Sequence, residues 1–387
     1  MQFIAKTFSG LEELLAEEIK VLGGKNIQLL TRGVQFEGDK KLLYRANYEL
    51  RTALRILVPV ASFQVSSDNV LYEKVRDINW HQWMNVDNTL AVDAVTFSEN
   101  LNHSHFIALR TKDAIVDQFR GRTGKRPSID TEKPDLAIQV HIGREDLCTV
   151  SLDSSGVSLH QRGTKLLSTA APVNEVLAAG MILLSGWDKK TPLMDFMCGS
   201  GTILMEAAMI LRNIPPQFKR EYFSFHHWKD FDPALWSEVV KEAQERIVTA
   251  PRLIYGIDIN KNAVNKAIAN IQGAGLEDVI QIESRSFQLS PPPADNGVII
   301  TNPPYGERLN DDQEVLNGLY RAIGDKLKQD YKGWWAWLIS SNTQALKHIG
   351  LHPTKKRTLF TGPLECKFLG YELFQGKRKE HLTQTRS

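Results

Sequence analysis

The chain has 387 residues, which is enough for two or three domains with full hydrophobic cores. Hydrophobic residues make up 42% and charged residues 24% of it, as in ordinary globular proteins, and the net charge of +2 does not by itself indicate a nucleic-acid partner. The three cysteines, Cys148, Cys198 and Cys366, are far apart in the sequence. Their spacing argues against a disulfide framework or a cysteine-based zinc site and fits a reducing cytosol.

The first residues lack the charged start and long apolar core of a signal peptide. No apolar run approaches the roughly 18 residues of a membrane span. We therefore expect a cytoplasmic protein without a membrane segment. The sequence also shows no cluster of His, Asp and Glu, so we expect no metal, and a monomer is compatible with what it shows.

Positive charge is concentrated in two segments. Residues 110–126 contain six Lys or Arg and two Asp, and residues 355–379 contain seven Lys or Arg and two Glu. Basic segments in a nearly neutral protein are able to contact phosphates, although a solvated surface is the simpler interpretation of charge alone.

The part of the chain before residues 154–172 mixes helical and extended patterns, and serine, glycine and proline interrupt the apolar pattern at that boundary. Apolar residues recur at helical spacing over residues 10–22 and 113–119. Extended segments are expected at residues 3–6, 34–36, 55–63, 137–142 and 147–152, the last two as neighbouring strands. This pattern predicts an α+β region without a catalytic cluster.

After that boundary, strand and helix patterns alternate. Strands are expected at residues 192–196, 253–257, 279–282, 298–301 and 334–340, and helices at 173–184, 202–212, 262–271 and 315–327. The alternation predicts a mostly parallel sheet covered by helices on both faces. Ligands of such sheets bind beyond the carboxyl ends of the strands.

A glycine-rich turn, residues 195–202, connects the first of these strands to a helix. Gly199 and Gly201 permit a sharp turn and close approach to a ligand, and the helix N-terminus offers free N–H groups. A tight turn without a ligand is the alternative. A dinucleotide fingerprint requires a third glycine three residues after Gly201, where Leu204 stands, so the pattern argues against NAD.

Asp258 ends the next strand, where a carboxylate is able to accept two hydrogen bonds from a ribose diol. Its alternative role is to cap the following helix, which Asn260 is also suited to do. The distance from Gly201 far exceeds the usual interval of about 20 residues, so residues 213–251 must be an insertion. The aromatic residues of this insertion, which include Phe218, Tyr222, Phe223, Phe225 and Trp228 beside Lys219 and Arg220, either stack on bases or form a small core.

The segment Asn302-Pro303-Pro304-Tyr305 directly follows a buried strand. Two successive prolines remove two backbone donors and stiffen the turn. The Asn302 side-chain oxygen and the Pro303 carbonyl are then able to accept both hydrogens of one amino group, while Tyr305 stacks on the flat group that carries it. This arrangement suits methylation of a conjugated amine by positioning and fixed dipoles, without a nucleophilic residue or a metal. A rigid turn without chemistry is the alternative.

Residues 195–202 resemble the cofactor loop, and residues 302–305 the amine-methylating motif, of class I S-adenosylmethionine-dependent amino-methyltransferases. Adenine-N6, guanine-N2 and glutamine-N5 enzymes share that motif. Residues 10–15, 112–117, 159–163, 171–172 and 302–309 further resemble the ribosomal RNA large-subunit guanine-N2 methyltransferases, so that the resemblance covers nearly the whole chain. It implies a ferredoxin-like segment at 1–55, a THUMP RNA-binding domain at 56–165 and a Rossmann-like methyltransferase domain with a mostly parallel seven-stranded sheet at 166–387.

The resemblance implies methyl transfer from S-adenosylmethionine to the exocyclic N2 amine of a guanosine in large-subunit (23S) ribosomal RNA. Its catalytic roles fall on Asn302, Pro303, Pro304 and Tyr305. It implies cofactor contacts from Asp195, Met197, Cys198, Gly199, Ser200, Gly201, Thr202, Asp258, Ile259, Ser284 and Asn302. Candidate phosphate contacts in basic loops are Arg120, Lys125, Arg126, Arg162 and Lys165, for which exposed solubility charge is the alternative.

One position departs from the family pattern. The third strand of the family often ends in an aspartate that contacts the adenine amine of the cofactor, but Arg285 is nearest to that place here. Either Ser284 or Ser286 substitutes for the aspartate, or backbone and apolar contacts hold the adenine.

Three other functions remain open at this point. DNA adenine-N6 methylation is compatible with the motif, although the long α+β region suits structured RNA better. A non-catalytic RNA-binding or assembly factor with a relic cofactor site is opposed by the intact motifs. Glutamine methylation of a protein would leave the N-terminal region unexplained.

Overall fold

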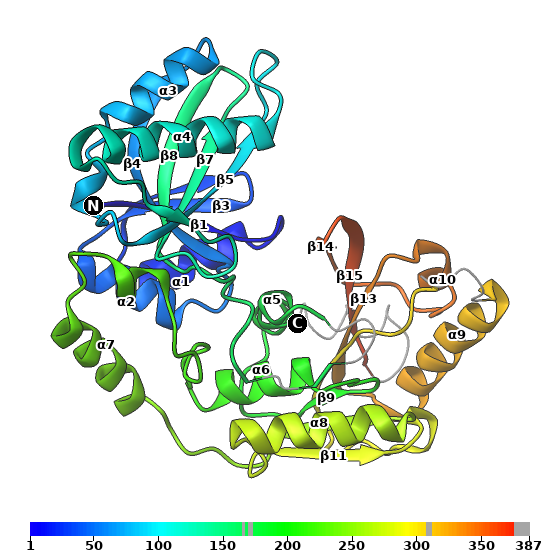
Figure 1. Cartoon of the computed structure of the whole chain (residues 1–387). Helices are drawn as coiled ribbons and strands as arrows, with labels where there is room; N and C mark the ends of the chain where they lie inside the picture. Colours follow the sequence, from blue (N-terminus) through cyan, green and yellow to red (C-terminus); the bar gives the residue numbers. More distant parts are fainter. Residues whose placement is uncertain (165–166, 169–172, 307–311, 375–387) are drawn as a thin grey trace. The chain divides into compact units, whose positions relative to one another are not determined.

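In a computed structural model, residues 1–164, 167–168, 173–306 and 312–374 are described, and they belong to two compact units (Figure 1). The first unit comprises Met1–Thr7, Leu15–Leu159 and Arg220–Glu242. The second comprises Phe8–Leu14, His160–Lys219 and the described residues from Ala243 onward. Each unit therefore includes one short segment that the other unit flanks in the sequence: Arg220–Glu242 in the first unit and Phe8–Leu14 in the second.

The first unit is built on an eight-stranded sheet with the strand order β2-β3-β1-β4-β8-β7-β5-β6. Its strands are β1 (Gln2–Lys6), β2 (Lys25–Leu30), β3 (Gly33–Glu37), β4 (Arg55–Gln64), β5 (Thr89–Thr96), β6 (Ser128–Ile129), β7 (Leu136–Ile142) and β8 (Leu147–Asp153). Its helices are α1 (Glu12–Val21, which begins in the second unit), α2 (Lys40–Glu49), α3 (Asp68–Asp77) and α4 (Ser104–Thr123), with a 3-10 turn, η1, at Trp80–Gln82.

Helices α3 and α4 lie along one face of this sheet (Figure 1). The alternating apolar residues of β7 supply the buried side, since Ile138, Val140 and Ile142 are each at most 1% exposed. The predicted pairing of this strand with β8 is confirmed, because the two form an antiparallel ladder. The helix expected at 113–119 is longer than predicted and ends at Gly124, whose left-handed backbone conformation stops it.

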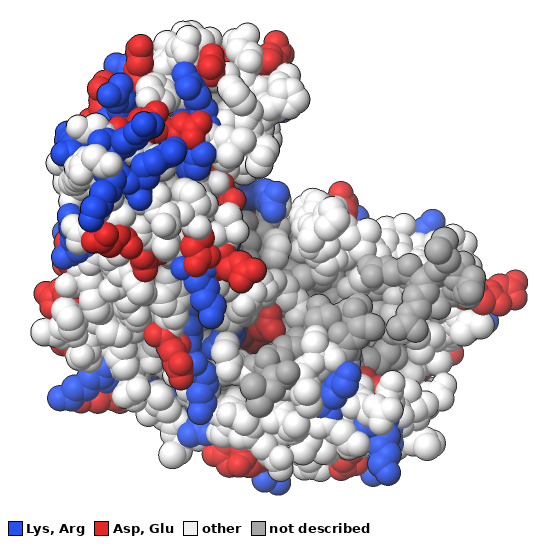
Figure 2. Space-filling model, in the orientation of Figure 1, with Lys and Arg blue, Asp and Glu red and all other residues white. Residues whose placement is uncertain are grey.

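Basic side chains gather at the C-terminal end of α4. Arg120, Arg122, Lys125 and Arg126 are all exposed. Figure 2 shows Lys and Arg side chains on the face of the first unit, in the region where α4 lies in Figure 1. Cations are favourable near the negative end of a helix dipole, so their position is compatible with a structural role as well as with an anionic partner.

The insertion contributes an aromatic core to the first unit. Phe223 and Phe225 are at most 1% exposed and stack on each other, with ring centroids 5.2 Å apart. Tyr44 of α2 stacks on Phe225 at 4.7 Å, and Trp236 of α7 (Pro233–Glu245) packs edge-on against Phe225 at 5.3 Å. Of the two interpretations that the sequence left open, core packing therefore holds for these residues, because no base has access to their ring faces.

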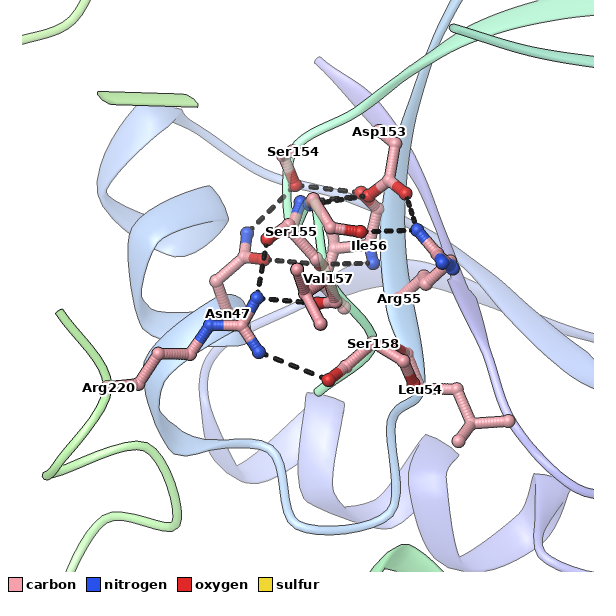
Figure 3. A network of polar contacts seen from close by, with 11 residues as sticks. Asn47, Leu54, Arg55, Ile56, Asp153, Ser154, Ser155, Val157, Ser158 and Arg220 are labelled. Carbon is pink, nitrogen blue, oxygen red and sulfur yellow. Dashed lines mark hydrogen bonds and ion pairs between the residues drawn. The ribbon is translucent and has the colours of Figure 1, made fainter. Parts of the chain in front are cut away.

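Arg220 fastens the insertion to the end of β8 (Figure 3). Its guanidinium donates to the carbonyl oxygens of Ser155 at 2.8 Å and Ser158 at 3.1 Å, and also to that of Val157. Asn47 of α2 contacts the same segment, since its amide donates to the Ser154 hydroxyl at 2.9 Å and accepts from the Ser155 hydroxyl at 2.6 Å. The segment after β8 lies outside the sheet, so its carbonyls have no hydrogen-bond donor from a neighbouring strand. Arg220 supplies donors for three of them.

We predict that Arg220→Ala destabilises the first unit by about 2 kcal/mol, because these carbonyls lose a charged donor. Arg220→Lys should recover only part of the loss, since an ammonium group lacks the planar fork of donors. Urea unfolding of the full chain, followed by tryptophan fluorescence, measures the effect. Lys219→Ala removes an exposed neighbouring cation and serves as the control; equal stability of the R220A and K219A variants would contradict this role.

The second unit contains a seven-stranded sheet with the order β11-β10-β9-β12-β13-β15-β14. Strands β9 to β13 run parallel, whereas β15 is antiparallel to both of its neighbours, β13 and β14. The strands are β9 (Leu193–Asp195), β10 (Ile254–Asp258), β11 (Ile280–Ser284), β12 (Gly297–Thr301), β13 (Trp334–Ser340), β14 (Lys355–Thr361) and β15 (Leu364–Glu372). The helices of this unit are α5 (Glu175–Ser185), α6 (Thr202–Leu211), α8 (Lys261–Ala274), α9 (Gln313–Asp330) and α10 (Thr343–Lys347), and it has a 3-10 turn, η3, at Phe287–Leu289. Another 3-10 turn, η2 (Ser224–His227), belongs to the first unit.

The predicted mostly parallel seven-stranded sheet is confirmed. One cluster of its core joins residues of α9, β12 and β13, among them Ile299, Ile323 and Leu338, which are fully buried. The N-terminal segment Phe8–Leu14 belongs to this unit, where Leu11 is fully buried and lies so close to Gly180 of α5 that a Cβ there would approach it to 2.7 Å. Among the described residues, no helix is long and apolar enough to cross a membrane.

Candidate active site

A cavity of about 1300 Å³ opens in the second unit at the carboxyl ends of its parallel strands. The ends of β9, β10 and β12 contribute Asp195, Asp258 and Asn302 to its lining. Parallel strands necessarily end at the same edge of a sheet, so segments far apart in the sequence meet there.

The glycine-rich turn forms one wall of this cavity. Gly199 and Gly201 have φ angles of 55° and 85°, which residues with side chains rarely adopt. Gly201 is also tightly packed, since a Cβ there would lie 3.2 Å from the Cβ of Ala267. Met197, Cys198, Gly199, Ser200 and Thr202 line the cavity, whereas Gly201 shapes the turn behind it.

Asp258 is held in place by two backbone N–H groups. Its carboxylate accepts from the N–H of Gly199 at 2.9 Å and from that of Asn260 at 2.8 Å. Asn260 caps helix α8, because its side-chain oxygen accepts from the N–H groups of Asn262 and Ala263. Asp258 is therefore not needed as the helix cap, and each of its oxygens retains a lone pair for a ligand. The adjacent Ile259, which also lines the cavity, is 77% exposed and offers an apolar surface.

Asp195 is almost completely buried and accepts a hydrogen bond from the N–H of Met197 at 3.1 Å. Burial raises the pKa of its carboxyl to about 7, and the nearby Asp258 carboxylate acts in the same direction. Burial also raises the pKa of the Cys198 thiol well above its usual range, which makes Cys198 unsuited to act as a nucleophile.

The raised pKa of Asp195 predicts a pH-dependent loss of stability. Between pH 4 and pH 7 this carboxyl is ionised in the unfolded chain but protonated in the folded one, so rising pH favours unfolding. Asp195→Asn, which mimics the protonated form, should therefore gain stability relative to the wild type as the pH rises, by about 4 kcal/mol between pH 4 and pH 8. Chemical denaturation of the cofactor-free protein at several pH values measures this, and a difference that does not change with pH would contradict it.

The end of β11, the third strand of the second unit in sequence order, contributes no aspartate to the cavity lining. Ser284 is exposed and lies outside the cavity lining, and Arg285 forms an ion pair with Glu283 at 2.9 Å. Ser286, Phe287 and Gln288 line the cavity instead. Of the two serines that the sequence left open, Ser286 lines the cavity and Ser284 does not.

The diproline corner, residues 302–305, lines the same cavity as the glycine-rich turn, with all four of its residues in the lining. The Tyr305 hydroxyl donates to the side-chain oxygen of Asn302, so the tyrosine folds back onto the corner here. The Tyr305 carbonyl accepts from the Asn342 amide at 3.1 Å, and the Pro304 carbonyl accepts from the Tyr320 hydroxyl at 3.2 Å.

The five candidate phosphate contacts have different environments. Arg120, Lys125 and Arg126 are exposed in the first unit. The expectation for Arg162 requires correction, since its side chain is fully buried in the second unit and its Nε donates to the Glu206 carboxylate at 3.1 Å. Glu206 of α6 is itself buried and needs a cationic partner, so this arginine has a structural role. Lys165 lies outside the described residues.

Several lining residues carry no sequence signal. The cavity is also lined by Leu319 and Ala322 of α9, by Thr361 at the end of β14 and by Gly362 of the following turn. They come from a helix face and a hairpin turn without a motif, so only the sheet order reveals that they reach this place. Within the described part of the chain, no group of three or more His, Cys, Asp and Glu side chains is arranged to hold a metal.

Family models match three consecutive parts of the chain. The RlmL ferredoxin-like domain matches residues 2–57, the THUMP domain matches residues 65–153, and the RMKL-like methyltransferase domain matches residues 162–369. The chain belongs to the RMKL-like methyltransferase family. It is an S-adenosylmethionine-dependent methyltransferase in which ferredoxin-like and THUMP domains precede the catalytic domain, and the predicted family, fold class and cofactor are confirmed.

Relatives and solved structures agree with this assignment. A protein of Synechocystis sp. that is named as an RNA methyltransferase is 38% identical over 96% of this chain and 97% of its own length. The ribosomal RNA large subunit methyltransferase K/L of Syntrophotalea carbinolica is also 38% identical over 96% of this chain, which spans 54% of that protein.

Two crystal structures share the fold at a TM-score of 0.87 and an identity of 31%. One is named as a putative methyltransferase complexed with SAH, and the match covers 97% of this chain and 99% of that one. The other, from Listeria monocytogenes, is named as a predicted N6-adenine-specific DNA methylase, and the match covers 96% of both chains.

Proposed function

We propose that this protein transfers a methyl group from S-adenosylmethionine to the exocyclic N2 amine of a guanosine in large-subunit ribosomal RNA. The observation that carries the proposal is the position of the diproline corner, whose Asn302 and Pro303 line the same cavity as Gly199 and Asp258. An amine-binding corner and a cofactor-binding turn thus share one space in the second unit.

The cavity residues fit the proposed cofactor. The backbone-anchored Asp258 carboxylate suits a ribose diol, and the exposed Ile259 and the ring of Phe287 suit the faces of an adenine. The N-terminus of α6 and the Gly199 turn suit the polar end of the molecule. When bound, S-adenosylmethionine supplies an electrophilic methyl group on a sulfonium.

The corner then activates the nucleophile. The Asn302 side-chain oxygen and the Pro303 carbonyl accept the two N–H groups of the guanine amine, which directs its lone pair toward the methyl group. The N–C bond forms as the S–C bond breaks, and the amine proton leaves to solvent. Tyr305 turns away from Asn302 to stack on the base, which must leave its RNA stack to enter the cavity.

The domain composition supports RNA as the substrate class. The family model of the THUMP domain covers residues 65–153 of the first unit, and both curated relatives are named as RNA methyltransferases. The exposed cations at the end of α4, Arg120, Lys125 and Arg126, are the proposed phosphate contacts. DNA adenine-N6 methylation remains the alternative, since an adenine amine meets the same two acceptors and one structural neighbour carries that name.

We predict that Asn302→Ala lowers methyl transfer by about 100-fold or more, because one of two fixed acceptors is lost. S-adenosylmethionine binding should remain measurable by calorimetry. The assay uses labelled cofactor with ribosomal RNA from a strain lacking this gene, and mass spectrometry of the digested RNA identifies the methylated base and atom. Methyl incorporation only into DNA, or undiminished turnover of the N302A variant, would contradict the proposal.

The RNA contacts are tested separately by charge reversal. Lys125→Glu combined with Arg126→Glu should raise the KM for RNA and flatten the dependence of log affinity on log salt by about one unit per lost contact. Reversal of two exposed lysines elsewhere in the first unit, Lys20→Glu with Lys25→Glu, alters the net charge equally and is the control. Equal effects of the two double variants would show that these cations act only through net charge.

A further inference from the structure

The oxygen atoms of the diproline corner are not equivalent. The Pro304 carbonyl accepts from Tyr320, and the Tyr305 carbonyl accepts from Asn342. Among the described residues, the Pro303 carbonyl has no hydrogen-bond donor. Two carbonyls of the corner are therefore occupied by protein donors, while the oxygen next to Asn302 is left for a ligand.

Tyr320 reaches the corner from α9. It is fully buried, and its hydroxyl is paired with the Ser340 hydroxyl at 2.7 Å at the end of β13. Burial raises the pKa of Tyr320 to about 12, so the hydroxyl keeps its proton and acts as a donor at neutral pH. The Ser340 hydroxyl in turn accepts from the backbone N–H of Asn342 at 3.1 Å, which links both donors to one strand end.

The side-chain oxygen and nitrogen of Asn342 make different contacts. Its oxygen accepts from the N–H of Ala345 at 2.9 Å and caps helix α10. Its nitrogen donates to the Tyr305 carbonyl at 3.1 Å and to the Gln313 side-chain oxygen at 3.2 Å. Three contacts fix the direction of this amide, and substitutions are able to separate the cap from the donor.

We propose that Asn342 and Tyr320 are positioning residues of the diproline corner. They hold the Pro304 and Tyr305 carbonyls away from the substrate, so that the Asn302 oxygen and the Pro303 carbonyl alone receive the amine. This inference rests on the proposed function, since it concerns how the same corner receives an amino group. Prolines donate no backbone hydrogen bond, so the corner depends on such outside donors for its orientation.

The test uses substitutions that keep the cap and remove the donor. Asn342→Ser retains an oxygen for the Ala345 N–H, because serine is a good cap, but it provides no donor at the Tyr305 carbonyl. Asn342→Asp retains both cap and shape, but it places an acceptor against that carbonyl. Tyr320→Phe removes only a hydroxyl. Gln344→Ala, at an exposed position of the same helix, is the matched control.

We expect single-turnover methyl transfer to fall about 10- to 100-fold in the N342S and Y320F variants and further in the N342D variant, because small misplacements of a reacting group are costly. The affinity for S-adenosylmethionine and the KM for RNA should stay within about threefold of the wild type, and the unfolding midpoint of the N342S variant should match that of the Q344A control. A purely structural role would instead lower stability and cofactor affinity together with the rate.

The outcomes distinguish this inference from the proposed function. Wild-type rates in the N342S and N342D variants, or rate losses that parallel losses of cofactor affinity, would overturn the positioning role while leaving the proposed function intact. Failure of the wild-type protein to methylate ribosomal RNA, measured in the same experiment, would overturn the proposed function and the inference together.

Discussion

The parallel direction of β9, β10 and β12 is the constraint on which the active site depends. Because these strands end at one edge of the sheet, Asp195, Asp258 and Asn302 line one cavity although more than a hundred positions separate the first from the last. The proposed chemistry depends on how these groups are oriented. Backbone N–H groups fix the Asp258 carboxylate, and the two prolines of the corner have no N–H to donate. In the proposed mechanism, the site orients the reacting groups and supplies no nucleophile of its own.

The division of the chain into units does not follow sequence position alone. The chain passes between the two units five times. Phe8–Leu14 belongs to the second unit although the first unit precedes and follows it in the sequence, and Arg220–Glu242 belongs to the first unit although the second precedes and follows it. Domain boundaries drawn at residues 55 and 165 omit both exchanges. Neither unit is therefore a continuous segment, and experiments on either one are best made with the full chain.

The sequence predicts the parts of the protein in which local pattern and tertiary role coincide. The strand and helix alternation from residue 173, the left-handed glycines and the capping role open to Asn260 all follow from local chemistry. Partner choice does not: the burial of Arg162 depends on Glu206, 44 positions away, and the role of Phe225 depends on Tyr44. Asn342 lies in no motif, and only the fold brings it to the Tyr305 carbonyl.

The central claim is that the Asn302 side-chain oxygen and the Pro303 carbonyl together receive one amino group. A crystal structure of the protein with S-adenosylhomocysteine and a short RNA that contains the target guanosine tests it most directly. The account predicts the guanine N2 atom within about 3 Å of both oxygens, with Tyr305 released from Asn302 and stacked on the base. A bound base whose amine contacts neither oxygen would contradict it.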